Sequence, residues 1–158
     1  MYRFIPKDQF IKTPWKNGGG VTHEIATDAP NWGWRLSIAE VASDGPFSQF
    51  DRMARILTVI QGAGLDLLHA GGVIAARPMQ PVAFSGDMAI ECRRIAGLVH
   101  DFNVIYDPLR FVARVEVLQG ITYFGPSILG VLQPDGFHLG TGPLILDAPA
   151  LGVIIDPL

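Results

Sequence analysis

The sequence predicts an all-β protein, and three observations point to that class. Runs of alternating apolar and polar residues, rich in β-branched and aromatic side chains, recur along the chain. The 18 glycines and 12 prolines interrupt these runs, and turn signals come about every 8–12 residues. No sustained 3.6-residue apolar period with capping residues is present, so helices are expected to be few and short. A sandwich or barrel of short strands is therefore expected.

The expected strands follow in order along the chain. Residues 21–27 form the first such run, and residues 34–41 alternate most clearly between large apolar and polar or small side chains. The run 55–60 is followed by the turn residues 61–64, which predict a hairpin into residues 65–69. The later runs expected to form strands are residues 81–84, 88–95, 102–106, 111–118, 121–124, 128–132, 144–146 and 152–155.

The length and charge pattern bound the domain organisation. A chain of 158 residues that is 49% hydrophobic buries one substantial core, so one compact unit of residues 1–158 is expected. The turn at residues 97–101 and the stretch at residues 107–110 are the candidate seams within it, and the approximate halves are 1–106 and 107–158. Residues 115–158 carry four acids and no Lys or Arg. This segment is expected either to face another part of the chain or a second subunit, or to form an acidic, strand-rich surface.

The composition also excludes several partners and compartments. A net charge of -3 provides no basic field for nucleic acid or an anionic membrane surface. The N-terminus lacks the apolar region of a secretory signal, and the longest uncharged stretch is interrupted by Gly and Pro. A single cysteine, Cys92, forms neither an internal disulfide nor a zinc site by itself. A cytoplasmic protein that contacts neither nucleic acid nor membrane is expected.

No pattern indicates a metal or a cofactor. The histidines at positions 23, 69, 100 and 138 lack the short spacing of metal ligands, and no phosphate-binding glycine motif precedes a helix. The sequence therefore predicts neither metal nor cofactor, and Cys92 has no neighbouring base that would make it a nucleophile.

The most unusual segment is Trp15-Lys16-Asn17 followed by three glycines at positions 18–20. Consecutive glycines permit positive φ and the close approach of another group. The indole, ammonium and amide beside them provide a flat face, a cation and hydrogen-bonding groups. Either a ligand site or a tight, bulged turn leading into the first sheet strand accounts for this segment.

Three sequence blocks resemble the HutD/Ves family. They are PWKNGGG (14–20) with Thr22 and EIA (24–26), WRLSIA (34–39), and DGPFSQF (44–50); FSGD (84–87) and DFNV (101–104) agree with them. The resemblance implies a cupin-like (RmlC-like) β-barrel or jelly-roll architecture, with two packed barrel-like halves in one chain and a homodimer. In one branch of the family it also implies an association with bacterial histidine utilisation. The His and Glu spacing of metal-dependent cupins is absent, in agreement with a metal-free site.

Arg35 is the central residue of the candidate site. In a strand, Arg35 and Ser37 share one face, and an arginine inside a small barrel is costly unless it meets an acid or a bound anion. One interpretation is a buried ion pair with Asp101, Asp87 or Glu24. The other, which the resemblance favours, is a guanidinium fork for a substrate carboxylate.

Other polar and aromatic residues complete the candidate site. Asp101 and Asn103 project to the same side of a strand, unless they cap a turn instead. Arg55 offers a second cation, and the remaining members offer neutral hydrogen bonds or a ring wall. The candidate ligand-binding residues are Trp15, Asn17, Arg35, Ser37, Ser48, Phe50, Arg55, Asp101 and Asn103.

Three functions fit these residues. The first is a metal-independent binding protein for a small carboxylated metabolite, acting as a sensor or regulator in histidine utilisation. The second is an enzyme, such as an isomerase or hydrolase, that uses Asp101 or Glu24 as a general base beside Arg35. The third is a dimeric structural scaffold. Because no nucleophile and base form a recognisable pair, binding ranks first and enzymatic activity stays open.

Overall fold

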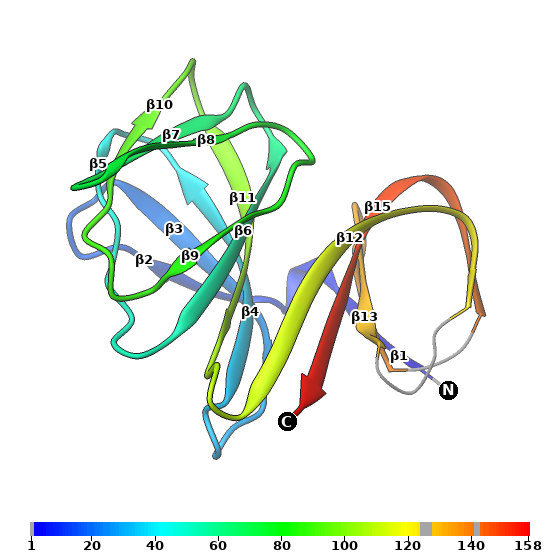
Figure 1. The fold of residues 1–158 in the computed structure, drawn as a ribbon. Helices are drawn as coiled ribbons and strands as arrows, with labels where there is room; N and C mark the ends of the chain where they lie inside the picture. The colour runs from blue at the N-terminus through cyan, green and yellow to red at the C-terminus, as the bar shows by residue number, and fades with distance from the viewer. Residues whose placement is uncertain (1, 124–127, 141–142) are drawn as a thin grey trace. The chain divides into compact units, whose positions relative to one another are not determined.

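The computed structural model describes residues 2–123, 128–140 and 143–158, and these consist of β-strands with one short 3₁₀ turn (Figure 1). All strand pairs within the sheets are antiparallel, which confirms the all-β class. The elements are β1 (Tyr2–Pro6), η1 (Lys7–Gln9), β2 (Ile11–Pro14), β3 (Gly20–Thr27), β4 (Trp34–Val41), β5 (Gly45–Pro46), β6 (Ala54–Gln61), β7 (Leu65–His69), β8 (Gly72–Ala76), β9 (Val82–Ser85), β10 (Glu91–Arg94), β11 (Val99–Tyr106), β12 (Phe111–Tyr123), β13 (Ile128–Gln133), β14 (Gly136–Gly140) and β15 (Pro143–Pro157). None of the described segments is a helix long and apolar enough to cross a bilayer.

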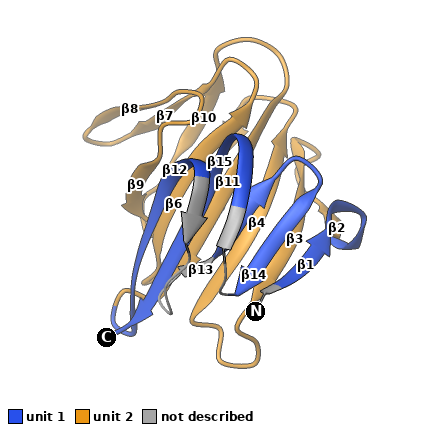
Figure 2. Cartoon of the chain, turned by 90° about the vertical axis from the view of Figure 1, so that its right-hand side faces the viewer, with its two compact units in different colours: residues 1–10, 109–158 blue, residues 11–108 orange. Residues whose placement is uncertain are grey.

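The chain divides into two compact units (Figure 2). One unit comprises residues 11–108, and the other combines residues 1–10 with residues 109–158. The division after Pro108 falls within one of the two candidate seams, 107–110, whereas residues 99–101 of the other lie within β11. The units differ from the expected halves at the N-terminus, because β1 pairs with β14 and so belongs with the C-terminal strands.

The unit of residues 11–108 contains two antiparallel sheets. One has six strands in the order β2-β3-β4-β11-β6-β9, and the other has four in the order β5-β10-β7-β8. Apolar side chains from both sheets pack into one core, whose buried members are Ala39, Val41, Leu57, Val59, Leu65, Leu67, Ala76, Phe84, Ile90, Cys92 and Val99. Two sheets over one core, with the chain passing repeatedly between them, form a cupin-like jelly roll.

The hairpin predicted for residues 55–60 and 65–69 is wrong. β6 pairs with β11 and β9, whereas β7 pairs with β8 and β10 in the other sheet. Residues 61–64 therefore carry the chain from one sheet to the other. Gly62 adopts φ 99°, and a Cβ at this position would lie 2.5 Å from the carbonyl oxygen of Leu98. The passage of the chain from one sheet to the other at Gly62 thus requires glycine because of the positive φ and the close backbone contact, and a hairpin turn would require glycine for the same two reasons.

The second unit is a five-stranded sheet in the order β1-β14-β13-β15-β12. Residues around Gly120 do not end a strand, since the register between β12 and β15 shifts there and pairing continues. The predicted strands 111–118 and 121–124 therefore belong to β12, except that Phe124 lies outside the described residues. Likewise, residues 144–146 and 152–155 both fall within β15. Val131, Leu146 and Ala150 are buried together beside Leu118.

Candidate functional site

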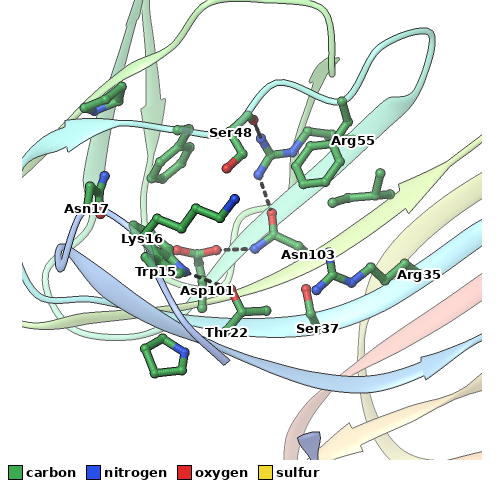
Figure 3. A pocket seen from close by; sticks show the side chains of 16 residues that line it. Trp15, Lys16, Asn17, Thr22, Arg35, Ser37, Ser48, Arg55, Asp101 and Asn103 are labelled. Atoms are coloured by element: carbon green, nitrogen blue, oxygen red, sulfur yellow. Dashed lines mark hydrogen bonds between the residues drawn. The ribbon is translucent and has the colours of Figure 1, made fainter. Parts of the chain in front are cut away.

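A cavity of about 450 Å³ lies in the unit of residues 11–108. Figure 3 shows the side chains that line it, from the loop after β2, from β3, β4, β6 and β11, and from the segment after β5. All nine candidate residues lie on its wall: Trp15, Asn17, Arg35, Ser37, Ser48, Phe50, Arg55, Asp101 and Asn103. Seven further lining residues are Pro14, Lys16, Thr22, Ala39, Pro46, Phe47 and Ile105.

Strand register explains why distant residues meet at this cavity. β11 lies between β4 and β6, and Asn103 is opposite Ser37 while Ile105 is opposite both Arg35 and Arg55. Because alternate residues of a strand share a face, the odd-numbered positions of these three strands point toward the cavity. Period-two alternation therefore also provides the signal for Ala39 and Ile105. Thr22 of β3 lies opposite Ala39 and so shares its face of the sheet. Pro46 ends the two-residue strand β5 and Phe47 follows it, and so short a strand carries no such signal.

The buried Arg55 anchors the polar side of the cavity. Its side chain is 6% exposed, and Nη2 donates to Oδ1 of Asn103 at 2.9 Å while Nη1 donates to the Ser48 carbonyl at 3.3 Å. Burial lowers the pKa of Arg55 to about 10, although the charge of Asp101 opposes this effect. The guanidinium is therefore a cation at neutral pH.

Aromatic rings surround the Arg55 guanidinium. Its central carbon lies 5.6, 5.2 and 5.1 Å from the ring centroids of Phe47, Phe50 and Phe84, respectively. Such cation–π contacts stabilise a guanidinium that has lost its water. Phe50 thus acts on the site by enclosing Arg55, in addition to lining the cavity as predicted.

Asp101 is fully buried and connected to Arg55 through Asn103. Its Oδ1 accepts a hydrogen bond from Nδ2 of Asn103, and among the described residues its Oδ2 has no hydrogen-bond partner. Burial raises the pKa of Asp101 to about 7, while the hydrogen bond from Asn103 and the charge of Arg55 lower it. Both side chains lie within β11 and neither caps a turn, so the turn-capping alternative is wrong.

Arg35 forms one of the three ion pairs considered from the sequence. Its Nε lies 3.1 Å from Oε1 of Glu24, and both side chains are half-buried. This contact uses one side of the guanidinium. Among the described residues, the ion pair at Nε is the polar contact of this guanidinium, and its geometry is not that of a hydrogen bond. The ion pair therefore orients Arg35 through Nε, and the two terminal nitrogens of the guanidinium are left for another group.

The Trp15 to Gly20 segment fits both interpretations of its sequence. Trp15 Nε1 donates to Thr22 Oγ1 at 2.8 Å, and Asn17 Oδ1 accepts from the Gly19 amide at 2.8 Å (Figure 3). The segment is thus a tight turn into β3 and at the same time a wall of the cavity. Lys16 extends from this turn toward the middle of the labelled side chains (Figure 3).

Gly20→Ala is expected to lower the free energy of unfolding by about 1–3 kcal/mol. A Cβ at Gly20 would lie 2.3 Å from the Glu40 carbonyl oxygen and 3.0 Å from the Trp15 ring, so the turn would have to shift. Urea denaturation measures the effect. Gly71→Ala is the matched control, because the nearest atom to its added Cβ would be in the His69 side chain at 3.2 Å. Equal stability of the two variants would contradict the prediction.

Two histidines meet Glu40 on the opposite face of the six-stranded sheet. Nε2 of His23 and Nε2 of His100 each lie 3.1 Å from a different carboxylate oxygen of Glu40. The hydrogen bond from His23 lowers the pKa of Glu40, and burial opposes it. Among the described residues, no three His, Cys, Asp or Glu side chains are arranged to hold a metal ion. Sequence spacing missed this cluster because three different strands supply it.

Cys92 is expected to react slowly with an aromatic disulfide reagent in the native protein. It is fully buried in the core, and burial raises the pKa of its thiol to about 12 from 9.0. At mildly alkaline pH this lowers the thiolate fraction by roughly a thousandfold. The rate is measured by absorbance before and after unfolding in urea. Equal rates in both states would contradict the burial of this thiol.

Comparison with known proteins identifies the family. The sequence pattern of the HutD family matches residues 7–124. An uncharacterized 21.2 kDa protein in the hutC 3′ region of Pseudomonas putida is 42% identical over 137 residues, which cover 82% of this chain and 71% of that protein.

Two similar solved structures cover 100% of this chain and of their own chains. One is a conserved protein of unknown function from Pseudomonas aeruginosa PAO1, with a TM-score of 0.87 and 30% identity. The other is HutD from Pseudomonas fluorescens SBW25 (formate condition), with a TM-score of 0.85 and 32% identity. With the family pattern matching most of its length, the chain belongs to the HutD family.

Proposed function

We propose that this chain is a metal-independent binding protein for a small carboxylated metabolite, and that it acts as a sensor or regulator in histidine utilisation. The observation that carries the proposal is the cation content of the cavity. Lys16, Arg35 and Arg55 line it, whereas Asp101 is the one acidic lining residue. A carboxylate would balance this excess of positive charge.

The geometry of Arg35 adds support. Glu24 contacts its Nε, so the planar fork is held in place while its terminal nitrogens stay available for two parallel hydrogen bonds to a carboxylate. Ser37 lies on the same face of β4, and its hydroxyl supplies a neutral partner beside the fork (Figure 3). Trp15 and Phe50 provide apolar walls for the body of the ligand.

The relatives support the proposed context. The P. putida relative is described by its position in the hutC 3′ region, and the P. fluorescens relative is HutD (formate condition).

Thermal unfolding of EDTA-treated protein with a panel of histidine-breakdown acids and their amides tests the proposal. A bound acid raises the unfolding midpoint in a dose-dependent way, because it stabilises the native state. Arg35→Ala is expected to abolish this rise. Arg94→Ala is the matched control, since Arg94 is also half-buried and ion-paired, to Asp44, but does not line the cavity. No rise with any acid would favour the scaffold interpretation.

An enzyme that uses Asp101 as general base is the second candidate. The specific observation is a cavity carboxyl whose pKa burial raises to about 7, which suits proton transfer at neutral pH. NMR of a stabilising acid incubated with the protein would reveal conversion, and Asp101→Asn should stop it. Glu24 is a weaker base candidate because it contacts Arg35.

The homodimer and the cytoplasmic location expected from the sequence stay predictions. Light scattering after size-exclusion chromatography tests the homodimer directly, since a monomer mass would contradict it.

A further inference from the structure

The buried carboxyl of Asp101 carries an inference about the same cavity, and it rests on the proposed function. We propose that an anion entering the cavity is bound together with one proton, which is held on Oδ2 of Asp101. Binding of the carboxylate would then respond to pH through one identified atom.

Hydrogen-bond polarity determines which oxygen carries the proton. A guanidinium only donates, so the atom of Asn103 that faces Arg55 at 2.9 Å is the acceptor Oδ1. The other end of the Asn103 amide is Nδ2, which donates to Oδ1 of Asp101. Because Oδ1 is already an acceptor, a proton on Asp101 belongs on Oδ2, the oxygen that has no partner.

Burial explains why the anion and the proton are linked. Asp101 is 0% exposed and lines the cavity, so water screens little of its charge. An ionised Asp101 would repel an anion held by Arg35 and Lys16, and like charges at one buried site favour protonation of one of them. Burial, opposed by the Asn103 hydrogen bond and the Arg55 charge, raises the pKa of Asp101 to about 7, so the proton is available near neutral pH.

Two ionisable groups that interact electrostatically with Asp101 have pKa values well above neutrality. Arg55 of β6 stays cationic with a pKa of about 10, and Cys92 of β10 stays a thiol with a pKa of about 12. Arg35 of β4, which is paired with Glu24 of β3, and Lys16 of the loop after β2 are the remaining charged groups on this side of the sheet. Among the lining residues there is no histidine. Asp101 is therefore the group that would make anion binding depend on pH near neutrality.

The test measures the apparent Kd of sodium formate from its effect on the unfolding midpoint, with sodium chloride at equal ionic strength as the reference. For the native protein, the apparent Kd is expected to be about tenfold lower at about pH 6 than at about pH 8. Asp101→Asn keeps the side-chain shape and never ionises. This variant is expected to give the same apparent Kd at both pH values.

A carboxyl ¹³C NMR titration of Asp101 in the unmodified protein provides an independent measurement that does not depend on the variant. Formate is expected to move the titration midpoint of Asp101 upward. The proton linkage would be overturned if the apparent Kd of formate were equal at both pH values and formate left the titration midpoint of Asp101 unchanged. If Arg35→Ala still abolished binding in that case, the proposal of carboxylate binding would stand. Absence of any formate effect at both pH values would contradict both proposals.

Discussion

Arg55→Ala is expected to lower the free energy of unfolding by about 3–5 kcal/mol at neutral pH, because it removes one member of a buried polar chain. The substitution leaves Oδ1 of Asn103 without its donor and removes the positive charge that lowers the pKa of Asp101. It also opens space among the three rings that enclose the guanidinium. Urea denaturation monitored by tryptophan fluorescence measures the loss.

Arg55→Met separates the two causes of this loss. Methionine fills most of the space among the rings but donates no hydrogen bond, so its deficit reports the polar contribution alone. Arg55→Ala should therefore be less stable than Arg55→Met, and both less stable than the unmodified protein. A loss below about 1 kcal/mol in the alanine variant would contradict the structural role assigned to Arg55.

Asp101→Asn is expected to remove a decline in stability between about pH 4 and pH 7. The folded-state pKa of Asp101 is raised from 3.8 to about 7, so within this window the folded chain keeps a proton that the unfolded chain has lost. The free energy of unfolding consequently falls as pH rises through the window, by an amount on the order of 4 kcal/mol for about three pKa units. Above pH 7 both states are ionised and the decline ends.

The measurement is the difference in unfolding free energy between the two proteins at several pH values, which cancels the contributions of the other groups. Relative to the unmodified protein, Asp101→Asn should gain stability steadily from pH 4 to pH 7 and then stay level. Asp8→Asn, at an exposed position, controls for the loss of one surface carboxylate. A difference that does not change with pH would show that the Asp101 carboxyl is ionised throughout.

Local patterns predicted the cavity residues that lie on regular strands. The alternation at residues 34–41 places Arg35 and Ser37 on one face, and the same rule places Asp101 beside Asn103; the structure confirms both. The sequence pattern does not indicate that Arg55 is buried and enclosed by aromatic rings. Its enclosing rings come from residues 47 and 50 after β5 and from β9, and no local pattern indicates that these segments converge.

Long-range pairing accounts for most of what the sequence did not reveal. Residues 61–64 have the composition of a hairpin turn whether the next strand stays in the sheet or leaves it, so the change of sheet is invisible locally. β2 is exposed along its whole length, and β8 and β14 are short and begin with glycine, so none of them shows a clear period-two burial signal. The partner of β1 lies at the far end of the sequence.

The pairing of β1 with β14 also affects the order in which the chain folds. Tyr2 is opposite Gly140 and Pro6 is opposite Gly136, so these contacts close only after nearly the entire chain has left the ribosome. The strands of residues 11–108 find all their sheet partners within one continuous segment. Because nearby contacts form sooner than distant ones, we expect the jelly roll to assemble first during synthesis. Addition of β1 to the edge of the five-stranded sheet, beside β14, would then be the late step of folding.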